Sequence, residues 1–173
     1  MDSLQVYSIS LGGMKDGMHQ FDFQIDTNFF AHFPESPIKE GAFEVKVALD
    51  KKPTVIDIQV GFEGKMAISC DRCLENMEMP LTGIERLLVK YSEEVKEESE
   101  EVVYIPYETS DWNIAKYIYE FICLAIPLIK THDLLDNGSC DEKMLSYLDG
   151  QEQSNAEEAT NPIWDQLKNI KLD

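Results

Sequence analysis

The segment ISCDRCLEN places two cysteines, Cys70 and Cys73, three positions apart in a chain that contains four cysteines. This C-x-x-C spacing allows two thiolates to bind one tetrahedral zinc ion. The same spacing occurs in thiol–disulfide redox couples, in which a lowered thiol pKa makes one cysteine reactive. The two residues can also be small packed side chains without a chemical role. The pair by itself therefore leaves a metal site, a redox couple and simple packing open.

Two further metal-binding side chains follow later in the sequence. His132 and Cys140 lie in the segment LIKTHDLLDNGSC, which we predict to be a loop after an apolar helix. With the C-x-x-C pair they form the candidate ligand set of one structural zinc: Cys70, Cys73, His132 and Cys140. Such a site would add folding free energy to a modest core. A second short-spaced pair of ligands is missing, so simple packing stays open beside the zinc interpretation.

The residues around the cysteine pair argue against redox chemistry and catalysis. A reactive thiol usually lies at the N-terminus of a helix, which lowers its pKa. The segment ENMEMPL after Cys73 instead alternates like a strand, and Asp71 opposes the effect of Arg72 on a nearby thiolate. A nucleophile pair of Cys73 and His132 has no identifiable orienting group or oxyanion element. The sequence also has no phosphate-binding loop and no dinucleotide fingerprint, so nothing indicates an enzyme.

The composition predicts one folded domain with a strongly negative surface. The chain has 173 residues, of which 43% are hydrophobic and 10% aromatic, as is ordinary for a globular protein. Its 33 acidic and 15 basic residues give a formal net charge of -18. Such a charge repels nucleic-acid phosphates and anionic lipid. We therefore expect no DNA partner and no membrane partner. A basic protein partner is favoured, and direct contact with RNA stays open.

The sequence shows no segment for export or membrane insertion. Residues 1–13 lack a basic start followed by a long apolar run. The longest apolar stretch, YIYEFICLAIPLI, contains Glu120 and Pro127 and is too short to span a bilayer. We expect a soluble cytoplasmic protein in a reducing compartment. There a cysteine pair more often binds metal or catalyses than forms a structural disulfide.

Alternating apolar residues predict several half-buried strands. The pattern is clearest in FDFQID, AFEVKVALD and TVIDIQVGF, and it continues on both sides of the cysteine pair. Short connections, among them Glu63–Gly64, predict antiparallel neighbours. A change of phase near Gly83 predicts a bulge or a bend. We expect an α+β fold with a mainly antiparallel, partly barrel-like sheet, and we place the cysteine pair on a connection between two strands.

A helix is predicted after the sheet, over Asp111–Ile126. Ser110 or Asp111 can cap this helix, three polar residues form a narrow stripe along it, and Pro127 ends it. Because nearly all its other residues are apolar, the helix should be buried against the sheet. Cys123 lies at the edge of the polar stripe, and we interpret it as a packed side chain and not as a ligand.

The rest of the pattern gives a domain map. Residues 1–148 are expected to form a single α+β domain, in which the glutamate-rich segment 92–101 is a solvated hairpin loop. Residues 149–160 are polar and acidic, which predicts a flexible linker. Residues 161–173 predict a C-terminal amphipathic helix with Trp164 on its apolar face.

Four motifs follow one another along the chain. They are the C-x-R-C turn in SCDRCLENMEMPL, the helix end in EFICLAIPLIKTH, the later GSC, and the closing NPIWDQLKNIK. In order and spacing they resemble the YceD-type large ribosomal RNA subunit accumulation proteins. The matching residues are Cys70, Arg72, Cys73, Glu120, Leu124, Ala125, Pro127, His132, Cys140, Asn161, Pro162 and Leu167. The motifs cover roughly the final 110 residues, and the additional C-terminal cysteines of some relatives are missing.

This resemblance implies a bacterial cytoplasmic protein, with relatives in plastids, that is needed for normal levels of large-subunit (23S) ribosomal RNA. The net charge argues against clamping that RNA through lysine and arginine contacts. We therefore expect a non-enzymatic ribosome biogenesis factor that binds a basic ribosomal protein or a pre-ribosomal particle. Its candidate partner-binding residues are Arg72, Glu97, Glu98, Glu100, Glu101 and Trp164.

Two other functions stay open. The first is an RNA-binding module with a small basic patch, made of Lys168, Lys171, Arg72 and Arg86. The second is a thiol-dependent enzyme that uses the C-x-x-C pair. Rapid alkylation of Cys73 at neutral pH would indicate such an enzyme.

Overall fold

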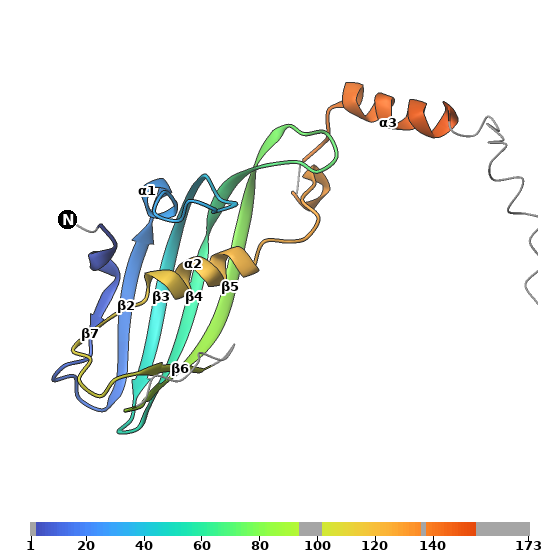
Figure 1. The fold of residues 1–173 in the computed structure, drawn as a ribbon. Coiled ribbons are helices and arrows are strands. Elements are labelled where there is room, and N and C mark those ends of the chain that lie inside the picture. The colour runs from blue at the N-terminus through green and yellow to red at the C-terminus, as the bar shows by residue number, and fades with distance from the viewer. Residues whose placement is uncertain (1–2, 94–101, 136–137, 155–173) are drawn as a thin grey trace, which may run out of the picture. The chain divides into compact units, whose positions relative to one another are not determined.

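The computed structural model describes three stretches of the chain: residues 3–93, 102–135 and 138–154. The chain divides into two compact units (Figure 1). The sheet unit comprises the described residues of 1–69 and 76–129, and the cysteine unit comprises those of 70–75 and 130–173. The chain therefore enters the cysteine unit twice, at Cys70 and at Lys130.

One open sheet of five strands forms the sheet unit (Figure 1). The strands are β2 (Gly17–Ile25), β3 (Glu40–Lys51), β4 (Val55–Ser69), β5 (Asn76–Tyr91) and β6 (Val102–Ile105). They lie side by side in chain order. The pairs β2–β3, β3–β4 and β4–β5 are antiparallel, and the pair β5–β6 is parallel. The predicted α+β class with a mainly antiparallel sheet is confirmed.

Strands β4 and β5 run longer without interruption than we predicted. The turn expected at Glu63–Gly64 is wrong, because both residues pair with β3 and with β5 inside β4. The bulge expected near Gly83 is also wrong, because Gly83 pairs with Phe62 in an unbroken register. A bulge would insert an extra residue and change which residues face the core. In both strands, however, the buried side chains stay on alternate residues from end to end.

The connection between β5 and β6 is not the hairpin that we predicted for segment 92–101. Val89 of β5 pairs with Val103 of β6 in a parallel ladder, whereas a hairpin joins antiparallel strands. The glutamate-rich composition indicates an exposed connection but carries no information about the direction of the strand that follows. Residues 94–101 lie outside the described residues.

Helix α2 (Ala115–Leu124) lies across one face of the sheet, which we call the covered face (Figure 1). Its Ile118 and Ile122 are fully buried. The covered face is apolar because alternate strand positions supply it: Phe43, Val45, Val47, Leu49, Ile56, Ile58, Val60, Phe62, Met66, Leu81, Leu87 and Val89. The helix predicted to be buried after the sheet is present, and burial of these apolar side chains is the main stabilising term of the unit.

The first residues of the predicted helix Asp111–Ile126 form a strand instead. Strand β7 (Asp111–Asn113) pairs antiparallel with β1 (Ser8–Ser10) near the N-terminus. The side-chain oxygen of Asn113 then accepts the backbone N–H of Ala115 at 2.9 Å, and α2 begins. The predicted caps Ser110 and Asp111 are therefore wrong. Pairing with a segment about 100 residues away outweighs the local helical pattern.

The N-terminal segment also packs through its aromatic rings. The 3-10 helix η1 (Ser3–Tyr7) precedes β1, and α1 (Thr27–Phe30) follows β2. The ring of Tyr7 lies edge-on to that of Phe29, with centroids 5.0 Å apart. Such edge-to-face pairs are favourable beyond the area that they bury.

The cysteine unit contains the turn 70–75, the 3-10 helix η2 (His132–Leu134) and the helix α3 (Glu142–Ser154). At the start of α3 the Asp141 carboxylate accepts the backbone N–H of Lys143 at 3.0 Å, a local cap. Helix α3 includes the first residues of the segment 149–160 that we predicted to be a linker. Residues 155–173, with the predicted C-terminal helix, lie outside the described residues. Within the described chain, no helix has the length and apolar character needed to cross a membrane.

Two glycines of β4 offer a matched test of the sheet packing. A Cβ atom at Gly64 would lie 2.2 Å from the carbonyl oxygen of Ala42, whereas one at Gly61 would have its nearest neighbours at 3.9 Å. We predict that Gly64→Ala lowers the free energy of unfolding by about 1–3 kcal/mol, because backbone must move to admit the methyl group. Gly61→Ala should change it by less than about 0.5 kcal/mol. Urea denaturation measures both, and equal stability of the two variants would contradict the packing.

Candidate metal centre

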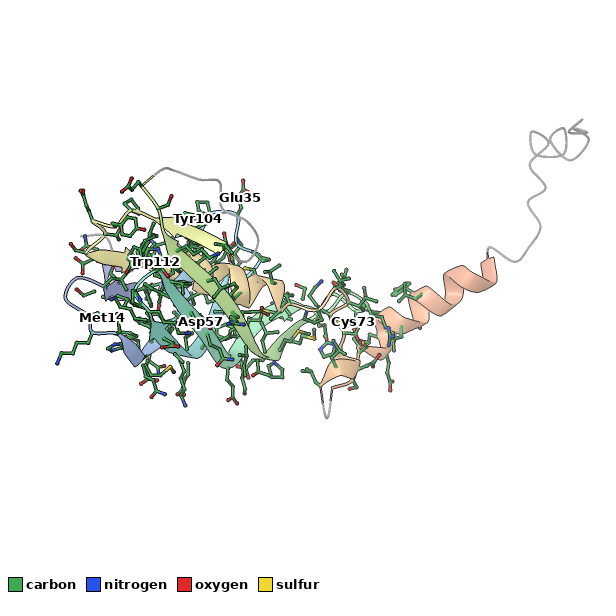
Figure 2. The ribbon with its side chains drawn as sticks, turned by 90° about the horizontal axis from the view of Figure 1, so that it is seen from below. Met14, Glu35, Asp57, Cys73, Tyr104 and Trp112 are labelled. Atoms are coloured by element: carbon green, nitrogen blue, oxygen red, sulfur yellow. The ribbon has the colours of Figure 1, made fainter. Side chains whose placement is uncertain are left out.

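A tight turn after β4 carries the cysteine pair, and Cys73 is labelled in Figure 2. The backbone N–H of Cys70 donates to the carbonyl of Glu75 at 2.8 Å, and the N–H of Leu74 donates to the carbonyl of Cys70 at 3.0 Å. Leu74 has a φ of 63°, in the left-handed region that non-glycine residues seldom adopt. The chain accepts this strained conformation in closing a turn that presents two thiols.

Four side chains of the cysteine unit converge beside this turn. The ligand atoms of Cys70, Cys73, His132 and Cys140 all lie within 4.8 Å of one another. The Sγ atoms of Cys70 and Cys140 are 3.8 Å apart. Nδ1 of His132 lies 3.4 Å from Sγ of Cys73 and 3.8 Å from Sγ of Cys140. The structure thus brings together all four residues of the candidate ligand set.

These distances fit the edges of a coordination tetrahedron. With Zn–S bonds of about 2.3 Å and a Zn–N bond of about 2.0–2.1 Å, tetrahedral geometry separates two sulfurs by about 3.8 Å and a sulfur from a nitrogen by about 3.5–3.6 Å. A disulfide would instead place two sulfurs about 2.05 Å apart. All four cysteines of the chain are free thiols. The cluster can therefore hold a metal ion, and the distances do not fit a disulfide.

The cluster is closed to solvent and offers four ligands. The exposed fractions are 0% for Cys70, 2% for Cys73, 9% for His132 and 8% for Cys140. Three thiolates and one imidazole complete a tetrahedral shell, so no position is left for water or substrate. Catalytic zinc sites keep such a position open. The geometry therefore suits a structural metal site better than a catalytic one.

The thiols of the cluster differ in acidity. Burial alone would raise the pKa of Cys70, but backbone N–H groups of Cys73, Arg72 and His132 point at its sulfur and lower the pKa to about 6. The N–H of Arg72 lies 3.4 Å from this sulfur. Burial raises the pKa of Cys140, and the neighbouring sulfurs of Cys70 and Cys73 raise it further. Cys70 is therefore the thiol most ready to act as an anionic ligand.

Asp71 clamps the cysteine turn to the chain that brings the second pair of ligands. Its backbone N–H donates to the carbonyl of Lys130 at 2.7 Å, and its carboxylate accepts the N–H of Lys130 at 2.7 Å. The ammonium of Lys130 lies 3.1 Å from the same carboxylate. The hydrogen bond from the backbone N–H of Lys130 is the largest cause of the lowered pKa of Asp71. The clamp positions the segment that leads directly to His132.

Arg72 makes a second link within the cysteine unit. Its guanidinium donates to the carboxylate of Asp133 at 2.7 Å, and this carboxylate is the main cause of the raised pKa of Arg72. The guanidinium also interacts with the Cys140 side chain. Partners outside the ligand shell that orient or neutralise the ligands commonly strengthen metal binding. Sequence reasoning identified Arg72, considered Asp71 only for its charge near the thiols, and missed Lys130 and Asp133, because nothing in the local pattern signals contacts across some 60 residues.

The fourth cysteine is not part of this cluster, and most of the predicted partner-binding residues lie outside the described residues. Cys123 is a half-buried residue of α2 in the sheet unit, and it does not belong to the ligand group. The predicted partner-binding residues Glu97, Glu98, Glu100, Glu101 and Trp164 lie outside the described residues. Of that set, only Arg72 has a described position, and its guanidinium is paired with Asp133.

The lowered pKa of Cys70 makes a prediction for chelator-treated protein. The Cys70 thiolate should form as the pH rises through about 6, because the N–H groups stabilise this anion. Thiolate absorbance near about 240 nm measures this titration. Cys70→Ser should remove the transition, and Cys123→Ser should keep it. A first thiolate that forms only above about pH 8, as in an ordinary cysteine, would contradict this assignment.

The searches of curated proteins and of solved structures found no match. A comparison with protein families found one, the family described as large ribosomal RNA subunit accumulation protein YceD, which matches residues 58–171. The matched segment contains the cysteine turn, α2 and both later ligands. Because the match covers more than half of the chain and agrees with the order of motifs in the sequence, the chain belongs to the YceD family of large ribosomal RNA subunit accumulation proteins.

Proposed function

We propose that the protein is a ribosome biogenesis factor that supports the accumulation of large-subunit ribosomal RNA by binding a basic ribosomal protein or a pre-ribosomal particle in the cytoplasm. Family membership supports the connection to large-subunit RNA. The observation that carries the choice of partner is the formal net charge of -18. A surface of this charge attracts basic proteins and repels bare RNA.

The two arginines of the alternative basic patch give little support to direct RNA binding. An RNA-binding surface needs lysines and arginines that are free to contact phosphates. Arg72 pairs with Asp133. Arg86 donates to the two carboxylate oxygens of Asp57 from its Nε and from one terminal nitrogen. The other two residues of the alternative basic patch, Lys168 and Lys171, lie outside the described residues. Binding of a basic protein partner, which we call the adaptor function, is therefore favoured over the RNA-binding module.

We further propose that the cysteine unit holds one structural zinc ion through Cys70, Cys73, His132 and Cys140. Soft thiolate ligands with one imidazole favour zinc over magnesium, calcium or manganese. The ion would connect the turn 70–75 with the segment that begins at Lys130. Among the described residues of this unit, few apolar side chains are buried, so metal binding would supply much of its stability. A closed site also argues against the thiol-dependent enzyme.

The zinc proposal predicts a defined metal content. Purified protein should contain close to one zinc per chain, as a four-ligand structural site requires. Cys70→Ser and His132→Ala should lose this zinc, because each removes one ligand from a closed shell. Cys123→Ser is the matched control and should keep it. Elemental analysis of gel-filtered protein measures the content, and metal-free wild-type protein with all thiols freely reactive would refute the proposal.

The adaptor proposal predicts salt-sensitive association with basic ribosomal proteins. Immobilised full-length protein should bind purified large-subunit ribosomal proteins, and the bound amount should fall steeply between about 50 mM and 300 mM KCl, because salt screens surface charges. Mass spectrometry identifies the bound proteins. Binding that is equal at both salt concentrations, or selective binding of protein-free ribosomal RNA, would contradict the proposal.

A further inference from the structure

The face of the sheet opposite α2 is polar and uncovered by the described helices of the sheet unit, and we call it the open face. It consists of the strand positions that alternate with the core positions, and Asp57, labelled in Figure 2, is one of them. Its residues in the three central strands include Ala42, Glu44, Lys46, Gln59, Glu63, Lys65, Ala67 and Thr82, all of them exposed. We propose that this open face binds an extended, lysine- or arginine-rich segment of the protein partner.

A hollow on the open face supplies room for such a segment. Its volume is about 580 Å³, and its walls come from β2 to β5 and from Thr27 at the start of α1. The short side chains of Ala42 and Ala67 contribute to its lining. Smaller hollows continue along the same face over Ala48 and Gly61. Short side chains along the middle strands therefore leave a trough between longer polar ones.

The charge of the hollow is negative. Its charged lining residues are Glu40, Glu44, Glu63, Glu78 and Lys65, four carboxylates and one ammonium. The ammonium of Lys65 pairs with Glu78 at 2.9 Å. Within the described part of the chain, the other three carboxylates take part in no ion pair. This excess of negative charge complements a lysine or arginine side chain.

Two of these carboxylates are held opposite each other by the register of the sheet. Glu44 of β3 pairs directly with Glu63 of β4. Like charges at directly opposed positions destabilise a sheet. Within β3, the cation on the open face that is nearest to Glu44 is Lys46. This residue is opposite Asp22 of β2. A cationic side chain placed between Glu44 and Glu63 would be attracted to both carboxylates. It would also offset the repulsion between them, so both effects favour binding at this position.

The chemistry of the hollow selects a protein segment over RNA. Proteins that bind single-stranded RNA on a sheet stack its bases on exposed aromatic rings. The one aromatic residue that lines this hollow, Phe43, is 2% exposed. An extended basic peptide needs only carboxylates and space for a backbone, both of which the open face offers. This inference rests on the proposed function, because it locates the surface that receives the basic partner.

A charge-matched pair of variants tests the open face. The probe is a fluorescent peptide of about twelve alternating lysine and small residues, roughly 40 Å long when extended. We predict that Glu44→Gln with Glu63→Gln weakens binding to the full chain about five- to tenfold. The control Glu85→Gln with Glu108→Gln removes the same charge at exposed positions outside the open face and should change binding less than about twofold. Fluorescence anisotropy measures both.

Equal weakening by the two double variants, or no binding of the peptide by the wild-type chain, would overturn the proposal. A second measurement does not depend on the variants. In NMR titrations of the wild-type chain with the same peptide, the backbone amides of Ala42, Gly61 and Ala67 should shift most. Shifts confined to residues outside the open face would also overturn it.

The failure of this inference is distinguishable from the failure of the adaptor function. If wild-type protein captures purified large-subunit ribosomal proteins and both double variants capture them equally, the open face is not the binding surface and the adaptor function stands. If wild-type protein captures none of them at low salt, the adaptor function itself fails. If only the double variant Glu44→Gln with Glu63→Gln loses capture of the ribosomal proteins, the result supports both the adaptor function and binding at the open face.

Discussion

Strand β4 is paired with β5 along its whole length and with β3 from Ile56 to Ala67, and both faces of the sheet follow from this register. Because side chains alternate across a strand, a shift of one residue would exchange the core positions for the solvent positions. The register therefore places Ile58 and Val60 on the covered face and, by the same step, Glu63 beside Glu44 on the other face. Core formation and the charge pattern of the open face are two results of one pairing.

The cysteine unit is organised on another principle. Its described buried residues are few and mostly polar or sulfur-containing: Cys70, Cys73, Thr131, His132 and Cys140. Apolar burial of this size cannot offset the conformational entropy lost in ordering two distant segments. Hydrogen bonds through Asp71 and Arg72 hold those segments in contact, and the ligand cluster lies between them. Stability here depends on specific polar partners, so single substitutions should matter more than in the sheet unit.

The sequence allowed the strands, the buried helix and the ligand set to be predicted, because period-two alternation and the rarity of cysteine and histidine are local signals. Two of the errors concern contacts between distant segments. The pairing of β7 with β1 converted the start of a predicted helix into a strand, and the parallel direction of β6 ruled out a hairpin. The alignment of Glu44 with Glu63 depends on how two strands are matched, so neither residue could be recognised from its own surroundings.

The order of the four ligands along the chain has a consequence for synthesis. Cys73 leaves the ribosome 67 residues before Cys140. At translation rates of about 5–20 residues per second, the first two thiols wait roughly 3 to 13 seconds for the last one. During that interval a nascent chain carries only two of the four side chains of the proposed zinc site. Formation of the proposed zinc site would therefore require the two early thiols to stay reduced until Cys140 has emerged.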